Sequence, residues 1–161
     1  MAKAGGAPLT LEGRGVRKLA VVDAERLWRG GNVQARGVVY LHSLGCRRLI
    51  DLTRRERPVE ARACRRAAIT YRKIPLSDAL SPAPGVVDDI LELLDDGTPT
   101  LVHCWQGRHR TGLVIAAYRV HRQHWTVDAA RAEMLTHGYG SPSARPSLWE
   151  AVADVARVRT P

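Results

Sequence analysis

One short stretch, Thr100–Gly112, constrains the fold and the chemistry of this chain more than any other; it reads TLVHCWQGRHRTG. The apolar run at its start predicts a short buried strand, and the long apolar segment after Gly112 predicts a helix. The tight loop between them begins at Cys104. This order of strand, loop and helix is typical of an anion-binding loop, because backbone N–H groups and a helix N-terminus converge there.

The residue types in this loop predict a phosphate site with a nucleophile at its base. A cysteine at such a position is favoured as thiolate over thiol. Arg110 offers a planar, permanently charged fork that matches two oxygens of a phosphate. Gly107 lets the backbone turn tightly enough to aim its N–H groups inward. We expect phosphate to be bound by the whole loop, which comprises Trp105, Gln106, Gly107, Arg108, His109 and Arg110.

A plainer interpretation makes Cys104 a small buried hydrophobic residue and Arg110 an ordinary surface charge. A cysteine and an arginine with five residues between them would not exclude it. Here His103, Gly107, the Thr-Gly pair after Arg110, the strand and the helix all point to the phosphate loop instead.

The length and composition indicate one globular domain. The chain has 161 residues, of which 45% are hydrophobic and 25% charged, as is usual for a folded domain with a buried core. We expect a flexible N-terminal arm over residues 1–14 and a single catalytic domain over 15–161. No apolar run approaches the roughly 18–20 residues that span a bilayer. The N-terminus, MAKAGGAPLT, lacks the apolar core of a secretory signal, so we expect a cytoplasmic protein.

The cysteine count and the net charge limit the disulfides, metal ions and binding partners that the chain is expected to have. The three cysteines fit no disulfide framework or zinc spacing, so Cys46 and Cys64 are expected in the core. We expect no metal and no cofactor. The net charge of +9 attracts anions in general, including phosphorylated peptides, inositol phosphates, nucleic acid and anionic membrane. Because the arginines are scattered, a solvated basic surface is favoured over a stable nucleic-acid site.

Hydrophobic periodicity predicts an α/β fold with a mainly parallel sheet. Strands and helices alternate along most of the chain, and the loop after a parallel strand is where such sheets bind ligands. The predicted strands are Val16–Val22, Glu25–Trp28, Leu49–Leu52, Tyr71–Ile74 and the run before His103. The predicted helices contain Val38–Leu44, Pro58–Ala67, Val86–Leu94, Gly112–His124, Val127–Leu135 and Leu148–Val158, and residues 75–85 form a loop.

The order His-Cys, five residues, Arg-Thr-Gly resembles the signature of the cysteine-dependent protein tyrosine phosphatase superfamily, in particular its compact, atypical dual-specificity type. The runs LWRGGNVQARGVVYLHSLGCRRLIDLTRRER and TYRKIPLSD are similar to the opening of that family and to the strand before its general-acid loop. The portion GRHRTG is similar to atypical plant and fungal members that act on inositol pyrophosphates. The resemblance implies a three-layer fold, with a central, mainly parallel sheet flanked by helices.

The resemblance also implies roles for individual residues. Thiolate Cys104 would attack phosphorus and form a phosphocysteine intermediate, while Arg110 and the loop N–H groups hold the non-bridging oxygens. His103 would orient the loop through hydrogen bonds. Thr111 would stabilise the leaving thiolate when water cleaves the intermediate.

Two residues are candidates for the general acid. Asp78, in the loop after Ile74-Pro75, resembles the movable acid of the family, although a loop aspartate also serves as a turn residue. His109 lies inside the phosphate loop, where some relatives carry a titratable residue. The neighbouring Arg108 either points to solvent or, as in relatives with a basic residue there, accompanies highly phosphorylated substrates.

These observations predict a phosphatase that acts on phosphate monoesters. The expected substrate is phosphotyrosine or another phosphoprotein residue, or else an inositol phosphate or a phosphoinositide. Two alternatives remain open: an RNA 5′-phosphatase, and a catalytically weak phosphate-binding module. The sequence does not determine the oligomeric state.

Overall fold

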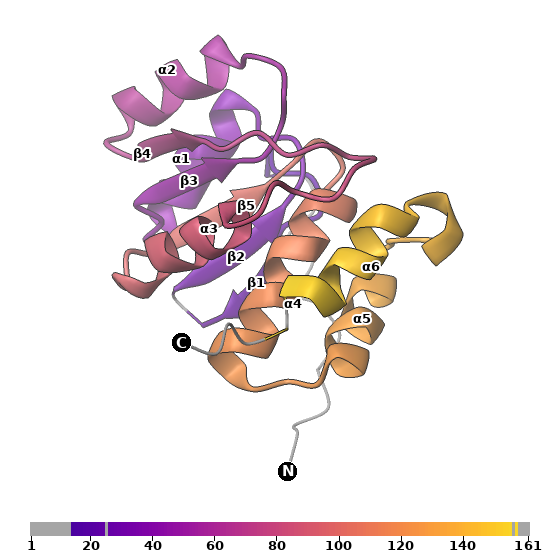
Figure 1. Cartoon of the computed structure of the whole chain (residues 1–161). Coiled ribbons are helices and arrows are strands. Elements are labelled where there is room, and N and C mark those ends of the chain that lie inside the picture. Colours follow the sequence, from indigo (N-terminus) through magenta and orange to yellow (C-terminus); the bar gives the residue numbers. More distant parts are fainter. Residues whose placement is uncertain (1–13, 25, 156, 158–161) are drawn as a thin grey trace. The chain divides into compact units, whose positions relative to one another are not determined.

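The structure is a computed structural model that describes residues 14–24, 26–155 and 157. The described part of the chain (Figure 1) divides into two compact units, the first within residues 14–76 and 97–107 and the second within residues 77–96 and 108–157. We call them the sheet unit and the helical unit. Apart from Arg14, the predicted arm lies outside the described residues, and the single catalytic domain over 15–161 stays a prediction.

The sheet unit contains a five-stranded sheet with the strand order β1-β2-β5-β3-β4. The antiparallel pair β1–β2 stands at one edge, and all other neighbouring strands are parallel. The predicted α/β fold with a mainly parallel sheet is therefore confirmed. The strands are β1 (Ala20–Asp23), β2 (Leu27–Gly30), β3 (Arg48–Asp51), β4 (Thr70–Lys73) and β5 (Thr100–His103).

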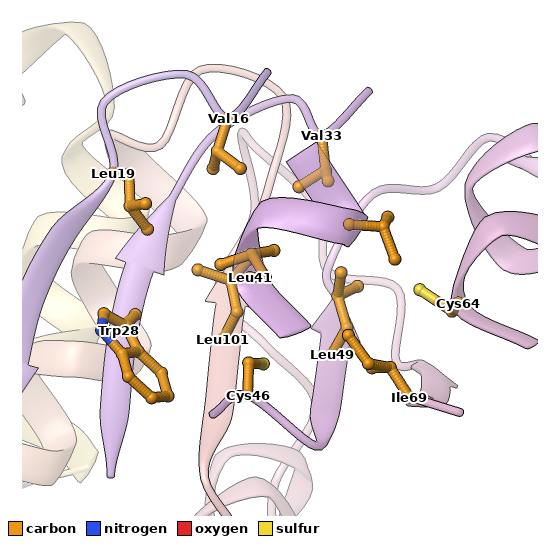
Figure 2. Packing of buried hydrophobic residues seen from close by; sticks show 11 residues of the cluster. Val16, Leu19, Trp28, Val33, Leu41, Cys46, Leu49, Cys64, Ile69 and Leu101 are labelled. Atoms are coloured by element: carbon orange, nitrogen blue, oxygen red, sulfur yellow. The ribbon is translucent and has the colours of Figure 1, made fainter. Parts of the chain in front are cut away.

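The core of the sheet unit forms where helix α1 (Ala35–Ser43) packs on the sheet (Figure 2). Leu41 of α1 and the register neighbours Leu49 and Leu101 are fully buried in it. Each such side chain contributes about 1.5–3 kcal/mol through burial. Helix α2 (Pro58–Arg66) adds Cys64, and the predicted burial of Cys46 and Cys64 is confirmed.

The N-terminal strands differ from their predicted bounds. Val16 forms only an isolated antiparallel bridge with Val33, and Lys18 has a positive φ of 49° that interrupts an extended chain. Strand β1 therefore starts only at Ala20, although apolar residues begin earlier. Strand β2 starts at Leu27, while Glu25, where the strand was predicted to begin, lies outside the described residues.

The helical unit is built around helix α4 (His109–Gln123), which packs against α3, α5 and α6. Helix α4 starts three residues before the predicted Gly112, because its first turn is polar and carries no apolar pattern. Thr126 caps α5, since its Oγ1 accepts the N–H of Ala129 at 3.1 Å. The other elements are α3 (Val86–Asp95), α5 (Val127–Thr136), the 3-10 turn η1 (Pro142–Ala144) and α6 (Pro146–Val155).

The remaining helices begin and end within a few residues of their predicted bounds. Residue 158, the predicted end of the last helix, lies outside the described residues. Among the residues that the structure describes, no helix is both long and apolar enough to cross a membrane.

Candidate active site

The predicted phosphate loop begins at the carboxyl end of β5, which lies between β2 and β3 and pairs with both in parallel. All four residues of β5 are buried. Cys104, which directly follows the strand, is only 2% exposed, and its Sγ accepts the N–H of Gly107 at 3.3 Å. The thiol therefore already faces one backbone donor of the loop, as the sequence predicts.

The loop lies in close contact with the Gly30-Gly31 segment, and Gly107 is the loop residue at this contact. Gly107 has a positive φ of 72°, and a Cβ added to it would lie 2.8 Å from the backbone of Gly30 and Gly31. A Cβ on Gly31 would in turn lie 2.9 Å from the backbone of Trp105 and Gln106. The sequence indicated Gly107 as a turn residue but did not single out Gly30 and Gly31. Their absent side chains let the two segments approach each other.

Side chains and backbone groups from β2 and the following segment also hold the loop. The buried Arg29 donates to the carbonyl oxygen of Gly107 at 3.3 Å, and the N–H of Asn32 donates to that of Trp105 at 2.9 Å. The indole ring of Trp105 is 50% exposed, and the guanidinium of Arg57 lies 5.2 Å from its centroid. Gln106 is also exposed. Trp105 and Gln106 are thus exposed to solvent, while the carbonyl groups of Trp105 and Gly107 accept hydrogen bonds from Asn32 and Arg29.

His103 is fully buried and makes the contact expected of an orienting residue. Its Nδ1 lies 3.2 Å from the carbonyl oxygen of Cys104, to which it can donate a hydrogen bond. This contact is to the backbone of the predicted nucleophile, and the orienting role of His103 stays a prediction.

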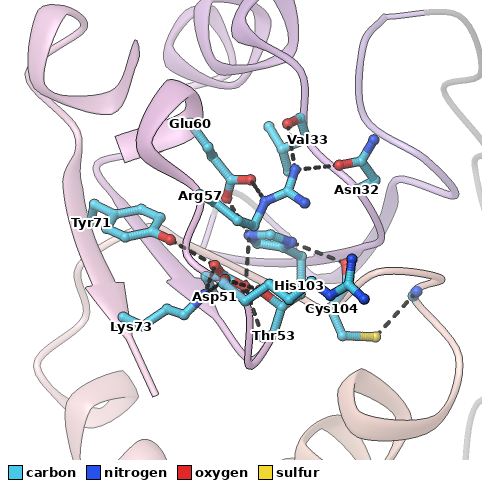
Figure 3. A network of polar contacts seen from close by, with 12 residues as sticks. Asn32, Val33, Asp51, Thr53, Arg57, Glu60, Tyr71, Lys73, His103 and Cys104 are labelled. Carbon is cyan, nitrogen blue, oxygen red and sulfur yellow. Dashed lines mark hydrogen bonds and ion pairs between the residues drawn. The ribbon is translucent and has the colours of Figure 1, made fainter. Parts of the chain in front are cut away.

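A buried group of acids and bases surrounds the other edge of the His103 ring (Figure 3). Its Nε2 lies 2.6 Å from Oε1 of Glu60 on α2 and 3.9 Å from Oδ1 of Asp51 on β3. Glu60 Oε2 also accepts the Nε–H of Arg57 at 2.5 Å. The sequence analysis singled out neither carboxylate as functional. Asp51 lies within the predicted strand Leu49–Leu52, and no local sequence pattern marks Glu60.

Asp51 is held in its charged form by several donors. Its Oδ2 accepts from the Tyr71 hydroxyl at 2.6 Å and from Lys73 Nζ at 2.9 Å, and its Oδ1 accepts the N–H of Thr53 at 2.8 Å. Burial by itself would raise the pKa of Asp51, but His103 and these donors together lower it below its ordinary value. Burial also raises the pKa of Tyr71, with the hydrogen bond to Asp51 as the second cause.

Asp51, Glu60 and His103 are the described residues whose ligand atoms lie close enough together to hold a metal ion. Their chemistry does not suit one. Asp51 is ion-paired with Lys73, and Glu60 is ion-paired with Arg57. A divalent cation would have to displace both of these side chains in a buried site. We therefore treat the group as an ion-pair network.

The C-terminal part of the loop belongs to the helical unit. Arg108 precedes the first residue of α4, and its carbonyl accepts the N–H of Gly112 at 3.0 Å. His109 and Arg110, in the first turn, are partly exposed, and Thr111 is fully buried. The first turn of α4 therefore carries the arginine and the hydroxyl that the sequence indicates.

The two candidate acids both lie in the helical unit. His109 Nε2 lies 3.0 Å from the carbonyl of Tyr139, whose ring it meets edge-on at 4.9 Å. Burial is the main cause that lowers the pKa of His109, and the nearby charge of Asp78 opposes this shift. Asp78 is exposed in a turn where Ser77 Oγ accepts the N–H groups of Ala79 and Leu80 at 3.1 and 3.0 Å. The lowered pKa leaves His109 mostly neutral near pH 7, and a neutral imidazole is a poor proton donor.

Known proteins share both the sequence pattern and the fold. Over 42 residues the chain is 48% identical to the dual specificity protein phosphatase TpbA of Pseudomonas aeruginosa, which covers 26% of this chain and 19% of TpbA. The crystal structure of P. aeruginosa TpbA matches with a TM-score of 0.73 at 22% identity, over 89% of this chain and 91% of that one. A TpbA structure in complex with pTyr has the same TM-score at 20% identity, with 91% and 96% covered. The catalytic core of the PP-IP phosphatase SIW14 from S. cerevisiae matches with a TM-score of 0.73 at 23% identity, over 84% and 83%.

These structural matches support the α/β fold described above. A family model matches a longer part of the sequence than the 42 residues shared with TpbA. The model of the DSP-PTPase phosphatase fused to NAD+ kinase, PTP-NADK, matches residues 12–148 and so includes the sheet, the loop and most of the helices. Because this match extends over most of the chain, the protein belongs to the PTP-NADK family of dual-specificity-type phosphatase domains.

Proposed function

We propose that this protein hydrolyses phosphate monoesters through a phosphocysteine intermediate on Cys104. The observation that carries this proposal is the Cys104 sulfur, which faces the Gly107 N–H at 3.3 Å in a loop directly after the central strand. Arg110 follows in the first turn of α4. A thiolate with backbone donors and an arginine is the set of groups that nucleophilic attack on a phosphate requires.

The reaction takes two displacements. In the first, the Cys104 thiolate forms an S–P bond while the bond from phosphorus to the leaving oxygen breaks, and Asp78 delivers a proton to that oxygen. In the second, water attacks phosphorus, its proton passes to the carboxylate of Asp78, and the S–P bond breaks to return the thiolate and release inorganic phosphate. Arg110 and the loop N–H groups hold the non-bridging oxygens in both steps, and Thr111 stabilises the departing thiolate.

The proposed substrate is phosphotyrosine or a phosphoprotein, or else an inositol phosphate or phosphoinositide. The pTyr complex of TpbA and the PP-IP activity in the name of SIW14 support these two classes. Arg108 and the net charge of +9 favour an anionic substrate in either case. We keep the cytoplasmic location as part of the proposal, on the grounds that the three cysteines are free thiols.

The test is phosphate release by purified protein on a phosphotyrosine peptide, a phosphothreonine peptide, phosphoinositides, an inositol pyrophosphate and 5′-triphosphate RNA. Turnover that disappears in Cys104→Ser supports the nucleophile, and the preferred substrate decides the class. Preference for RNA with a steep salt dependence would replace our substrate assignment by the RNA 5′-phosphatase. Tight phosphate binding without turnover on any substrate would leave only the binding module.

The role of Asp78 has its own test. Asp78→Asn should lower turnover and flatten the limb of the pH–rate profile that reports the general acid. His109→Gln serves as the matched variant at the other candidate. A profile that is unchanged in Asp78→Asn but flattened in His109→Gln would transfer the role to His109.

A further inference from the structure

His103, which directly precedes the predicted nucleophile Cys104, forms a buried pair with Glu60. Both residues are buried, with exposures of 0% and 2%. The two facing atoms, His103 Nε2 and Glu60 Oε1, lie 2.6 Å apart. Neither atom makes a hydrogen bond of ordinary geometry among the residues that the structure describes, so their 2.6 Å contact is an ion pair by distance. Both atoms lie in the interior of the protein.

The position of the ring restricts where the protons are. Since a carbonyl oxygen can only accept, the contact to the Cys104 carbonyl requires a proton on Nδ1. An unprotonated nitrogen and a carboxylate oxygen would repel each other at 2.6 Å in a buried site, so one of the two atoms carries a proton. That proton is bound either to Nε2, which makes His103 an imidazolium, or to Glu60, which leaves both residues neutral.

The surrounding charges favour the imidazolium. Glu60 accepts from Arg57 on its other oxygen, which stabilises the carboxylate. Asp51 is a second carboxylate at 3.9 Å from Nε2. The opposing cations are Lys73, Arg57 and the buried Arg29, but Lys73 and Arg57 contact the carboxylates directly and Arg29 contacts the Gly107 carbonyl.

Two neutral groups complete the surroundings of this pair. Tyr71 reaches Asp51 through its hydroxyl. The pKa of Cys64 is raised to about 12, first by burial and then by Glu60, so this thiol stays protonated. The two carboxylates lie only 2.6 and 3.9 Å from Nε2, and Coulomb interactions are strongest at short distance.

We propose that Glu60 is a positioning residue that keeps His103 doubly protonated, so that a fixed positive charge lies beside Cys104 and stabilises its thiolate. This inference rests on the proposed role of Cys104 as nucleophile and adds a residue on α2 to that site. The positive imidazolium lies next to Cys104 in sequence and contacts its carbonyl, whereas the compensating Glu60 lies beyond the ring. In Figure 3 the His103 ring lies between the Glu60 carboxylate and the Cys104 side chain.

The experiment compares Glu60→Gln with Glu56→Gln. A glutamine side chain has nearly the shape of glutamate but carries no charge. The Glu60→Gln substitution therefore removes the negative charge that stabilises a doubly protonated His103. Glu56 is an exposed residue just before α2, so Glu56→Gln makes the same chemical change outside the network. The first readout is the rate at which iodoacetamide alkylates Cys104, followed by mass spectrometry of the Cys104 peptide across pH. The second is the number of one-bond N–H couplings of the ¹⁵N-labelled His103 ring, measured on wild-type protein and on both variants.

We expect the midpoint of the Cys104 alkylation profile to rise by about one pH unit in Glu60→Gln, which is a roughly tenfold slower reaction on the acidic side. The Glu56→Gln profile should coincide with that of wild type. His103 should show two ring N–H couplings at neutral pH in wild type and in Glu56→Gln, and one in Glu60→Gln. The wild-type spectrum needs no variant and so stays decisive if Glu60→Gln fails to fold.

A single ring coupling in wild-type His103, or coincident alkylation profiles for the two variants, would overturn the inference. Turnover by Cys104→Ser separates this failure from that of the proposed function. If Cys104→Ser is inactive while the two glutamine variants have coincident profiles, the nucleophile stands and only the role of Glu60 is wrong. If Cys104→Ser keeps full turnover, the proposed function itself is wrong.

Discussion

Replacing Gly107 by alanine tests whether the phosphate loop is packed as tightly as the structure indicates. A Cβ at this position would lie 2.8 Å from Gly30 and Gly31 backbone atoms, at a φ of +72°. Gly45, after α1, offers a matched control in the same unit. It has a φ of +93°, but a Cβ there meets nothing within 4 Å. Both substitutions therefore force alanine into the left-handed region, and only Gly107→Ala adds a steric clash.

The expected magnitudes follow from these two costs. A left-handed conformation costs a residue with a Cβ about 1–2 kcal/mol, which is the whole loss of stability expected for Gly45→Ala. Forcing a further atom into a packed site costs about 1–3 kcal/mol more. We therefore expect Gly107→Ala to lose about 2–5 kcal/mol. The neighbouring backbone cannot yield like the end of a flexible side chain, because the contacting atoms belong to the chain itself.

Urea unfolding followed by circular dichroism measures both losses, and phosphate release measures the effect on the loop. A tilted Gly107 N–H no longer faces the Cys104 sulfur, so turnover by Gly107→Ala should fall by about 100-fold or more, as for the loss of one oxyanion donor. Gly45→Ala should keep wild-type turnover. Equal losses of stability in the two variants would refute the tight contact between Gly107 and the Gly30-Gly31 segment.

Three further predictions concern the helical unit. Thr126→Ala should lower stability to urea by about 1 kcal/mol through loss of the α5 cap, and Thr126→Ser should restore it; an unchanged midpoint would contradict the cap. Arg122→Gln breaks two surface contacts to Asp95 at 2.6 and 2.7 Å; we expect a loss of at most about 1 kcal/mol that shrinks with added salt, and a larger, salt-independent loss would show a different role. Because burial lowers the pKa of His109, the unfolded chain binds more protons than the native one as the pH falls through the ordinary histidine value, so stability should drop there. Urea midpoints between about pH 8 and pH 5 should fall less in His109→Gln than in wild type, and parallel curves would contradict the shift.

Local patterns were enough to predict most of the fold. The buried strand at Leu49, the helix that starts at Pro58 and the capped helix after Thr126 all occur as predicted, because each depends on residues close together in sequence. The contact between Cys104 and Gly107 was predictable for the same reason, since the two residues lie only a few positions apart, whereas phosphate binding by this loop stays a prediction.

The parts that sequence reasoning missed depend on contacts between distant segments. Glu60 meets His103 only through the tertiary packing of α2 against α1 and β4, and the local sequence of α2 is that of an ordinary surface helix. Arg29 and Gly31 approach Gly107 across the β2–β5 pairing. The start of α4 at His109 was missed for another reason, since its polar first turn has no apolar residue to mark it.

These distant contacts change how the loop signature should be interpreted. The Cys104 carbonyl is held by His103, the Trp105 carbonyl by the N–H of Asn32, and the Gly107 carbonyl by Arg29. Backbone donors aimed at an anion stabilise it most when they need no rearrangement to do so. In this protein the loop carbonyl groups are held from strand β2, from the segment after it and by His103. Under the proposed function, a chain with the same loop but without these contacts would keep Cys104 and Arg110, yet would have to order its backbone donors each time phosphate binds.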